Sequence, residues 1–242
     1  MNDTYQWSPK RLLIVHAALL LLLLSWLFEP TRGLWLSLDE GWFRFSDQSL
    51  KKGGDAWRLF WAVMNHEWFD YLFGLVLLSV FIISGLHAGR ERWAWHLAVI
   101  SVAAIAAFIG TRIGNLLPID RYSATLEFRD AFHLSEWVSG FKTKDYSDDT
   151  FPGDHGVVGF IIAGFSLCYL KRGYGWASVV LAVMYVIPRL VAGAHWLSDE
   201  LVGAVFVCGI ILAWFFYTPL AKVLVERFEA VWSWLLQRVL LQ

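Results

Sequence analysis

Six apolar stretches, each about as long as a membrane crossing, dominate this sequence. A helix rises about 1.5 Å per residue, so about 20 residues cross a bilayer core of roughly 30 Å. The chain has 242 residues and is 57% hydrophobic, which is more apolar than soluble domains of this length usually are. We therefore predict an all-α integral membrane protein whose residues 1–218 form a six-transmembrane-helix bundle. The predicted spans are 12–28, 69–87, 93–111, 155–170, 174–190 and 198–217.

The connecting segments carry patterns of their own. In residues 219–242 apolar residues recur at helical spacing between charged ones, which predicts an amphipathic helix on the cytoplasmic surface of the membrane. Residues 35–45 and 57–68 are rich in aromatic residues and are separated by the turn signal Gly53-Gly54. We expect two short helices there, resting on the outer surface.

Short basic connections predict the orientation. Lys10-Arg11 precede the first span, Arg90 and Arg92 lie between the second and third, and Lys171-Arg172 lie between the fourth and fifth. With six spans these residues fall on one side, and short basic loops mark the cytoplasm. Both termini are therefore expected to be cytoplasmic. The net charge of −1 means that the chain lacks the excess of basic residues typical of nucleic-acid-binding proteins, so we expect no nucleic-acid partner.

Two histidines, His155 and His195, stand 40 residues apart at the ends of apolar stretches. A chain that leaves His155, crosses the membrane, turns and crosses back uses nearly all of that interval. Both histidines should therefore meet at the same face, together with Arg189 and Asp199. By the orientation above, that face is the outer one.

The segment around His155 is typical of an anion site. Proline and Gly153 end a loop, and an apolar helix begins at once with Asp154 and His155. The first turn of a helix leaves backbone N–H groups unpaired and carries the positive end of the helix dipole. A histidine there can donate a proton to an oxygen that leaves a bound phosphate. The alternative is that Asp154 is only a helix cap and His155 only a polar residue at the interface.

The segment from Arg189 to Asp199 supplies the complementary groups. Arginine presents a planar fork of donors that matches phosphate oxygens. His195 could attack phosphorus if one ring nitrogen is free, and Asp199 could hold the other nitrogen. The alternative is a polar loop between two spans in which Ser198 or Asp199 caps the sixth predicted span.

Phosphoryl transfer depends mainly on positioning and on charge stabilisation, so a lipid phosphate needs further cations. Arg112 and Arg121 follow the third span on the outer side. Arg121 is a candidate phosphate ligand, whereas Arg112 could equally be an anchor whose charge reaches the headgroups.

Together these residues resemble the type 2 phosphatidic acid phosphatase superfamily of integral membrane phosphatases. That family carries the motifs K-x6-R-P, P-S-G-H and S-R-x5-H-x3-D on the outer face of six spans. The spacing of Arg189, His195 and Asp199 matches the third motif, with Pro188 in place of its serine. The second motif matches at its ends, with Gly153 in place of serine and Asp154 in place of glycine. In the first motif Arg121 stands for the arginine, with no lysine seven residues before it.

Within the superfamily, the run 144–156 is most similar to transferases that move the terminal phosphate of undecaprenyl diphosphate to the 1-phosphate of lipid A. The resemblance implies a multi-pass protein of the bacterial inner membrane with a periplasmic site, lipid substrates, and no metal or cofactor. It also implies that His195 is the nucleophile that forms a phosphohistidine, that Asp199 holds it, and that His155 is the acid. The implied phosphate ligands are Arg189, Arg121, Gly153, Asp154 and Arg112.

Three alternatives stay open. The first is a lipid phosphatase that uses water as the acceptor. The second is a metalloenzyme built on His155, His195 and Asp199, although neither segment has close paired-histidine spacing. The third is a membrane scaffold or transporter without enzymatic activity.

Overall fold

The computed structural model describes residues 7–240, which form helices and loops, with no strand among them. The elements in chain order are α1 (Pro9–Leu27), α2 (Glu29–Lys52), α3 (Asp55–Met64), α4 (Glu67–Ala88), η1 (Arg90–Arg92), α5 (Trp93–Gly114), α6 (Ala124–Glu127), α7 (Leu134–Trp137), α8 (Asp154–Tyr169), α9 (Arg172–Val191), η2 (Asp199–Ala204), α10 (Val205–Tyr217) and α11 (Leu220–Leu240). The predicted all-α class is confirmed.

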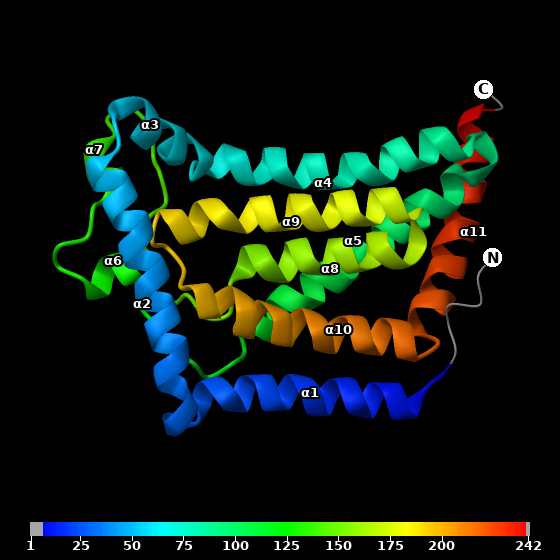
Figure 1. Cartoon of the computed structure of the whole chain (residues 1–242). Helices are drawn as coiled ribbons and strands as arrows, with labels where there is room; N and C mark the ends of the chain where they lie inside the picture. The colour runs from blue at the N-terminus through cyan, green and yellow to red at the C-terminus, as the bar shows by residue number, and fades with distance from the viewer. Residues whose placement is uncertain (1–6, 241–242) are drawn as a thin grey trace.

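A bundle of long apolar helices makes up most of the molecule (Figure 1). Within residues 7–240, five helical segments are long and apolar enough to cross a membrane: α1, α4, η1 with α5, α9, and η2 with α10. They coincide with five of the six predicted spans to within a few residues. The sixth, α8, has 16 residues and is therefore shorter than the other five. It packs against α5, α9 and α10 in the interior of the bundle. The six-span arrangement accordingly stays a prediction.

Helix α2 lies across one end of the bundle, nearly at right angles to α1 (Figure 1). It is followed by α3, and the two helices are separated at Gly53-Gly54, as predicted. α2 is longer than expected because it starts directly after α1, at Glu29. Its inner face carries two buried carboxylates, Asp39 and Asp47, which is unusual for a surface helix.

Helix α11 lies at the opposite end of the bundle and occupies the segment predicted to be amphipathic (Figure 1). It packs against α5, where the indole N–H of Trp232 donates to the Ser101 hydroxyl at 3.1 Å. Val225 is buried in the same contact region. Its place on a membrane surface stays a prediction.

Candidate active site

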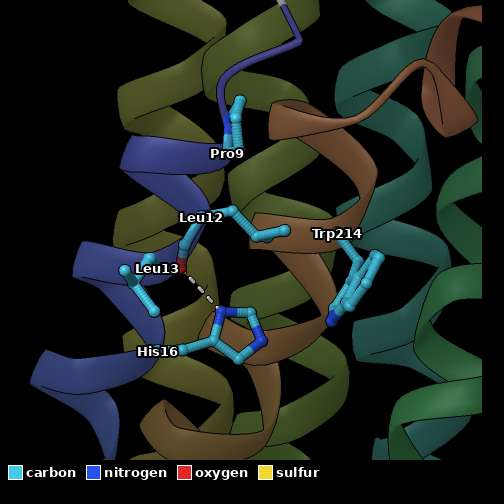
Figure 2. A pocket seen from close by; sticks show the side chains of 5 residues that line it. All are labelled: Pro9, Leu12, Leu13, His16 and Trp214. Atoms are coloured by element: carbon cyan, nitrogen blue, oxygen red, sulfur yellow. Dashed lines mark hydrogen bonds between the residues drawn. The ribbon is translucent and has the colours of Figure 1, made fainter.

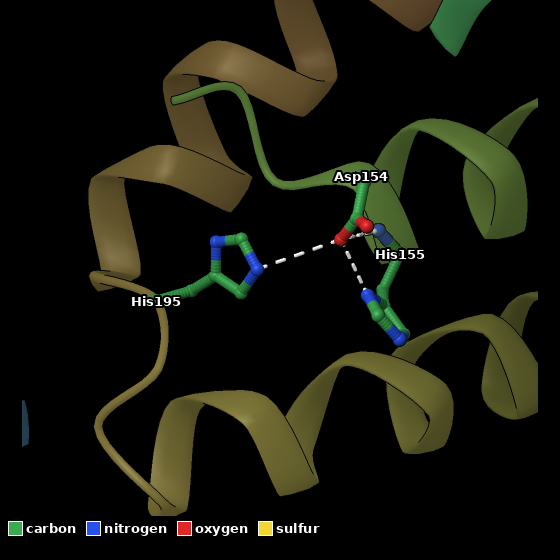
Figure 3. A group of neighbouring side chains, drawn as sticks. All are labelled: Asp154, His155 and His195. Atoms are coloured by element: carbon green, nitrogen blue, oxygen red, sulfur yellow. Dashed lines mark hydrogen bonds and ion pairs between the residues drawn. The ribbon is translucent and has the colours of Figure 1, made fainter. Parts of the chain in front are cut away.

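The two histidines meet at the end of the bundle that α2 covers. Their ring centroids are 6.3 Å apart. The carboxylate of Asp154 lies between the two rings (Figure 3), with Oδ1 at 3.4 Å from His195 Nε2 and at 2.5 Å from His155 Nδ1. The prediction that a 40-residue interval returns His195 to His155 is confirmed.

One nitrogen of the His195 ring makes a hydrogen bond, whereas the other makes none among the described residues. The chain turns sharply after α9 at Gly193, whose φ of +74° favours glycine, and the turn directs His195 into the protein. Nδ1 lies 3.0 Å from the Thr150 carbonyl oxygen, which can only accept, so Nδ1 is the donor. Nε2 is buried and has no hydrogen-bond partner among the described residues. In the neutral ring this nitrogen carries the lone pair that a nucleophile needs.

Burial and the neighbouring carboxylates change the pKa of His195 in opposite directions. Burial by itself would lower its pKa, but the carboxylates of Asp154 and Asp199 outweigh that effect and raise the pKa to about 10. An anion in front of Nε2 therefore stabilises the protonated ring.

Asp199 holds the loop that carries His195. Its Oδ2 accepts from the Trp196 amide at 2.7 Å, and its Oδ1 accepts from Arg121 at 2.7 Å. Oδ2 lies 3.8 Å from His195 Nδ1, beyond hydrogen-bond distance. The expected direct hydrogen bond between His195 and Asp199 is thus replaced by the bond to Thr150.

Arg121 connects three segments of the chain. Besides Asp199, its guanidinium donates to the Ser198 hydroxyl at 2.8 Å and to Asp39 of α2 at 2.6 Å. It also lies over the Trp196 ring, 4.7 Å from the centroid. Asp39 in turn accepts from the amide and the hydroxyl of Ser198. The surface helix α2 is therefore bound to the loop that precedes η2.

His155 stands in the first turn of α8 with a carboxylate at each ring nitrogen. Nδ1 faces Asp154, and Nε2 lies 3.0 Å from Asp70 Oδ1 on α4. Nε2 also lies 3.2 Å from Nε of Arg189. The nitrogen can donate to Asp70 or accept from Arg189, but it cannot do both at once. A protonated His155 can donate to both carboxylates, which is the state that a general acid requires.

Arg189 is buried in the last turn of α9 and is fully engaged. Its NH2 donates to Asp70 Oδ2 at 2.7 Å, and its NH1 donates to the carbonyl and side-chain oxygens of Asn65 at 3.2 and 3.3 Å. The Asn65 amide donates back to the Pro188 carbonyl at 2.9 Å. Like Arg121, Arg189 is paired with carboxylate, so a phosphate would have to share these guanidinium groups with Asp70, Asp39 and Asp199.

Of the two remaining predicted phosphate ligands, Gly153 lies at the site and Arg112 does not. Gly153 directly precedes α8, and its amide donates to the Asp199 carbonyl at 3.0 Å, which joins the two motif segments. Arg112 is exposed on α5, with its guanidinium 5.0 Å from the Phe108 ring. Among the described residues Arg112 makes no ion pair, and it is not part of the histidine cluster.

A carboxyl group that the sequence patterns did not single out lies beside the histidines. Glu200 is 1% exposed, and neither of its side-chain oxygens has a hydrogen-bond partner among the described residues. Its carboxyl group lies against the start of α8. A Cβ added at Gly153 would be 2.2 Å from Glu200 Oε1, and one at Gly156 would be 1.9 Å from Oε2.

The cluster could also hold a metal ion. One ligand atom each from Asp154, His155 and His195 lies within 4.8 Å of the others. Imidazole and carboxylate suit zinc and related ions. The geometry is therefore compatible with the metalloenzyme alternative, in which Asp154 rather than Asp199 would be the third ligand.

Several residues of the site escape sequence reasoning. Asp39, Asn65, Asp70 and Glu200 come from four different segments, and their contacts depend on how helices far apart in the sequence pack. A signal existed for two of them: Asp70 and Glu200 are carboxylates in the first turns of apolar helices. Ionisable residues in membrane helices are functional candidates by default.

A hollow elsewhere in the bundle is separate from this site. It lies between α1 and α10, near the start of α1 (Figure 2). Its only ionisable side chain, His16, is bonded to the Leu12 carbonyl in its own helix. The lining residues are Pro9, Leu12, Leu13, His16 and Trp214.

Comparison with known proteins identifies the family. A family model described as the PAP2 superfamily matches residues 120–223, which contain both histidines, Arg121, Arg189 and Asp199. The chain is also 32% identical over 225 residues to lipid A 1-diphosphate synthase of Escherichia coli (strain K12), covering 90% of this chain and 92% of that protein. The chain belongs to the PAP2 superfamily.

A second relative is YbjG of Escherichia coli (strain K12), provisionally named an undecaprenyl-diphosphatase. It is 32% identical over 120 residues, which is 46% of this chain and 54% of that protein. No solved structure matches the chain. Membership makes this membrane protein an enzyme of the lipid phosphotransferase and phosphatase type.

Proposed function

We propose that the enzyme transfers the terminal phosphate of undecaprenyl diphosphate to the 1-phosphate of lipid A through a phosphohistidine at His195. The observation that carries this proposal is the state of the His195 ring. One nitrogen is fixed on a carbonyl, and the other is buried, makes no hydrogen bond, and faces Asp154 Oδ1 at 3.4 Å beside a second histidine. The 32% identity to lipid A 1-diphosphate synthase along nearly the whole chain supports the choice of donor and acceptor.

In the first step Nε2 of His195 attacks the terminal phosphorus. A nitrogen–phosphorus bond forms, the bond from phosphorus to the bridging oxygen breaks, and undecaprenyl monophosphate leaves. Protonated His155 gives its proton to the departing oxygen. Asp154 occupies the place in front of Nε2, but its side chain is 52% exposed, so it can turn outward as a phosphate enters.

In the second step an oxygen of the lipid A 1-phosphate attacks the phosphorus on His195, and its proton passes to His155, which regains the protonated form. The nitrogen–phosphorus bond breaks, and lipid A 1-diphosphate is released. Arg121, Arg189 and the backbone around Gly153 hold the phosphate oxygens, with Asp154 at the rim. Asp199 keeps the loop of His195 in place. Arg112, which stands apart on α5, contributes as a membrane anchor rather than as a phosphate ligand.

The site is proposed to face the periplasm from the inner membrane, with both termini in the cytoplasm. The short basic connections support this orientation. The side chains supply the nucleophile and the acid, so we expect no requirement for a metal ion. Turnover that is abolished by a chelator and restored by zinc would instead support the metalloenzyme alternative.

The acceptor assay tests the proposal. Purified enzyme receives undecaprenyl diphosphate labelled in its terminal phosphate, with and without lipid A. We expect label in lipid A 1-diphosphate and little free phosphate. Label that appears only as free phosphate would show the second candidate, a phosphatase with water as acceptor, which the likeness to YbjG favours.

A further inference from the structure

Glu200 is a buried carboxyl group beside the histidines to which the proposed mechanism gives no role. It lies in η2, a π-helical turn that begins at Asp199. Such turns often occur at functional sites because they redirect side chains. Here Asp199 is directed to Arg121 and Trp196, while its neighbour Glu200 is directed to the start of α8.

The space for this carboxyl group exists because positions 153 and 156, just before and within the first turn of α8, are glycines. Real Cβ atoms do not approach another heavy atom as closely as 2.2 Å or 1.9 Å, so a side chain at Gly153 or Gly156 would overlap Glu200. The Glu200 carboxyl group thus fills the volume that a side chain at position 153 would fill. In the motif P-S-G-H, position 153 carries a serine, and the Glu200 carboxyl group occupies the space of that serine's Cβ.

The burial of Glu200 bears on its protonation. An ionised carboxylate without hydrogen bonds is far more costly to bury than the neutral acid. The titratable groups around Glu200 include Asp154 and His155 on α8, His195 in the preceding loop, Asp199 in its own turn, Tyr185 on α9 and Cys208 on α10. Two of them are carboxylates, and both arginines of the site are already paired with Asp39, Asp70 and Asp199. A neutral acid lacks the charge that would repel a phosphate, and it has an O–H to donate.

We propose that Glu200 is a phosphate-binding residue which, as the neutral acid, donates a hydrogen bond to the substrate phosphate in place of a side chain at position 153. This inference rests on the proposed phosphoryl transfer at His195. The Glu200 carboxyl group lies against Gly153 and Gly156 at the start of α8, where both of its oxygens lack a hydrogen-bond partner among the described residues. It supplies the uncharged donor that a glycine at position 153 cannot supply.

The test exchanges the donor between the two positions. In Glu200→Ala the donor is lost, and kcat/KM for labelled undecaprenyl diphosphate should fall about 10²-fold. Gly153→Ser alone should lower it at least as much, because the new Cβ overlaps Glu200. The double variant Gly153→Ser/Glu200→Ala has both the hydroxyl and the room for it. We expect the double variant to recover to within about tenfold of the wild type.

Two controls make the outcome decisive. Glu200→Gln keeps the shape and an N–H donor and should retain most activity, whereas Glu226→Gln on α11, which removes an exposed carboxylate, should change nothing. The melting temperature and gel-filtration profile of each variant report folding. The proposal is overturned if folded Glu200→Ala keeps the wild-type kcat/KM, or if the double variant is no better than Glu200→Ala.

A readout without turnover separates this inference from the proposed function. Orthovanadate, which has the shape of a transferring phosphate, should bind the wild type and Glu200→Gln with similar Kd and Glu200→Ala about 10²-fold more weakly. Should the wild type fail to transfer phosphate, the proposed function fails while vanadate binding still tests Glu200. Equal vanadate affinity in all three proteins would overturn the role of Glu200 alone.

Discussion

The contact between α2 and the loop of His195 makes a specific prediction for Asp39→Ala. The Asp39 carboxylate is 1% exposed and accepts from the Ser198 amide at 2.7 Å, the Ser198 hydroxyl at 2.6 Å and Arg121 at 2.6 Å. Removing one partner of a buried ion pair costs about 3–5 kcal/mol. Arg121 keeps Asp199 as a partner, so we expect the free energy of unfolding to fall by about 3 kcal/mol, the lower end of this range.

Activity should fall with this change, because the same loop carries His195. A displacement of about 1 Å at a reacting group can cost about 10²-fold in rate, and we expect a loss of that size in kcat/KM for the lipid donor. The assays are thermal or denaturant unfolding of the purified protein and single-turnover transfer from labelled undecaprenyl diphosphate.

The same helix offers a matched control, Asp47→Ala. Asp47 is 3% exposed and accepts from the Phe132 amide at 2.7 Å, with Lys51 also at 2.7 Å. Its loss should destabilise the protein to a similar extent but leave kcat/KM unchanged, because none of its contacts reaches the loop of His195. Asp39 does not position the loop of His195 if Asp39→Ala loses stability but keeps full activity, or if Asp47→Ala lowers activity equally.

Two further predictions concern the histidine pair and the arginines. Attack requires an unprotonated Nε2, so a His195 pKa raised to about 10 means that wild-type kcat/KM rises with pH toward that value. Asp154→Asn removes the main carboxylate that raises this pKa and should move the rise to lower pH; unchanged pH profiles would contradict this. Arg189→Lys loses the fork that contacts Asp70, and kcat/KM should fall about 10²–10³-fold. Arg112→Lys should have little effect, and equal losses in the two variants would place Arg112 in the phosphate site after all.

The sequence predicts features that arise within one segment of the chain, but not contacts between distant segments. The apolar stretches are local, and counting residues across two crossings was enough to bring His155 and His195 together. The Thr150 carbonyl that fixes His195, and the distance of Asp199 from that ring, depend on which groups already engage Asp199. The contact between Asp39 and Ser198 spans 159 residues and arises only when α2 packs across the bundle end. Patterns within one segment carry no information on such a contact.

Trapping the enzyme-bound phosphate is the most direct test of the mechanism. Enzyme mixed with undecaprenyl diphosphate labelled in its terminal phosphate is quenched in alkali within the first turnover, before the acceptor is added. The mechanism predicts label that is stable to alkali, labile to acid and attached to the peptide of His195. The label should be absent in His195→Ala and should pass to lipid A when acceptor is added to the wild type. Label on another residue, or transfer that persists in His195→Ala, would contradict it.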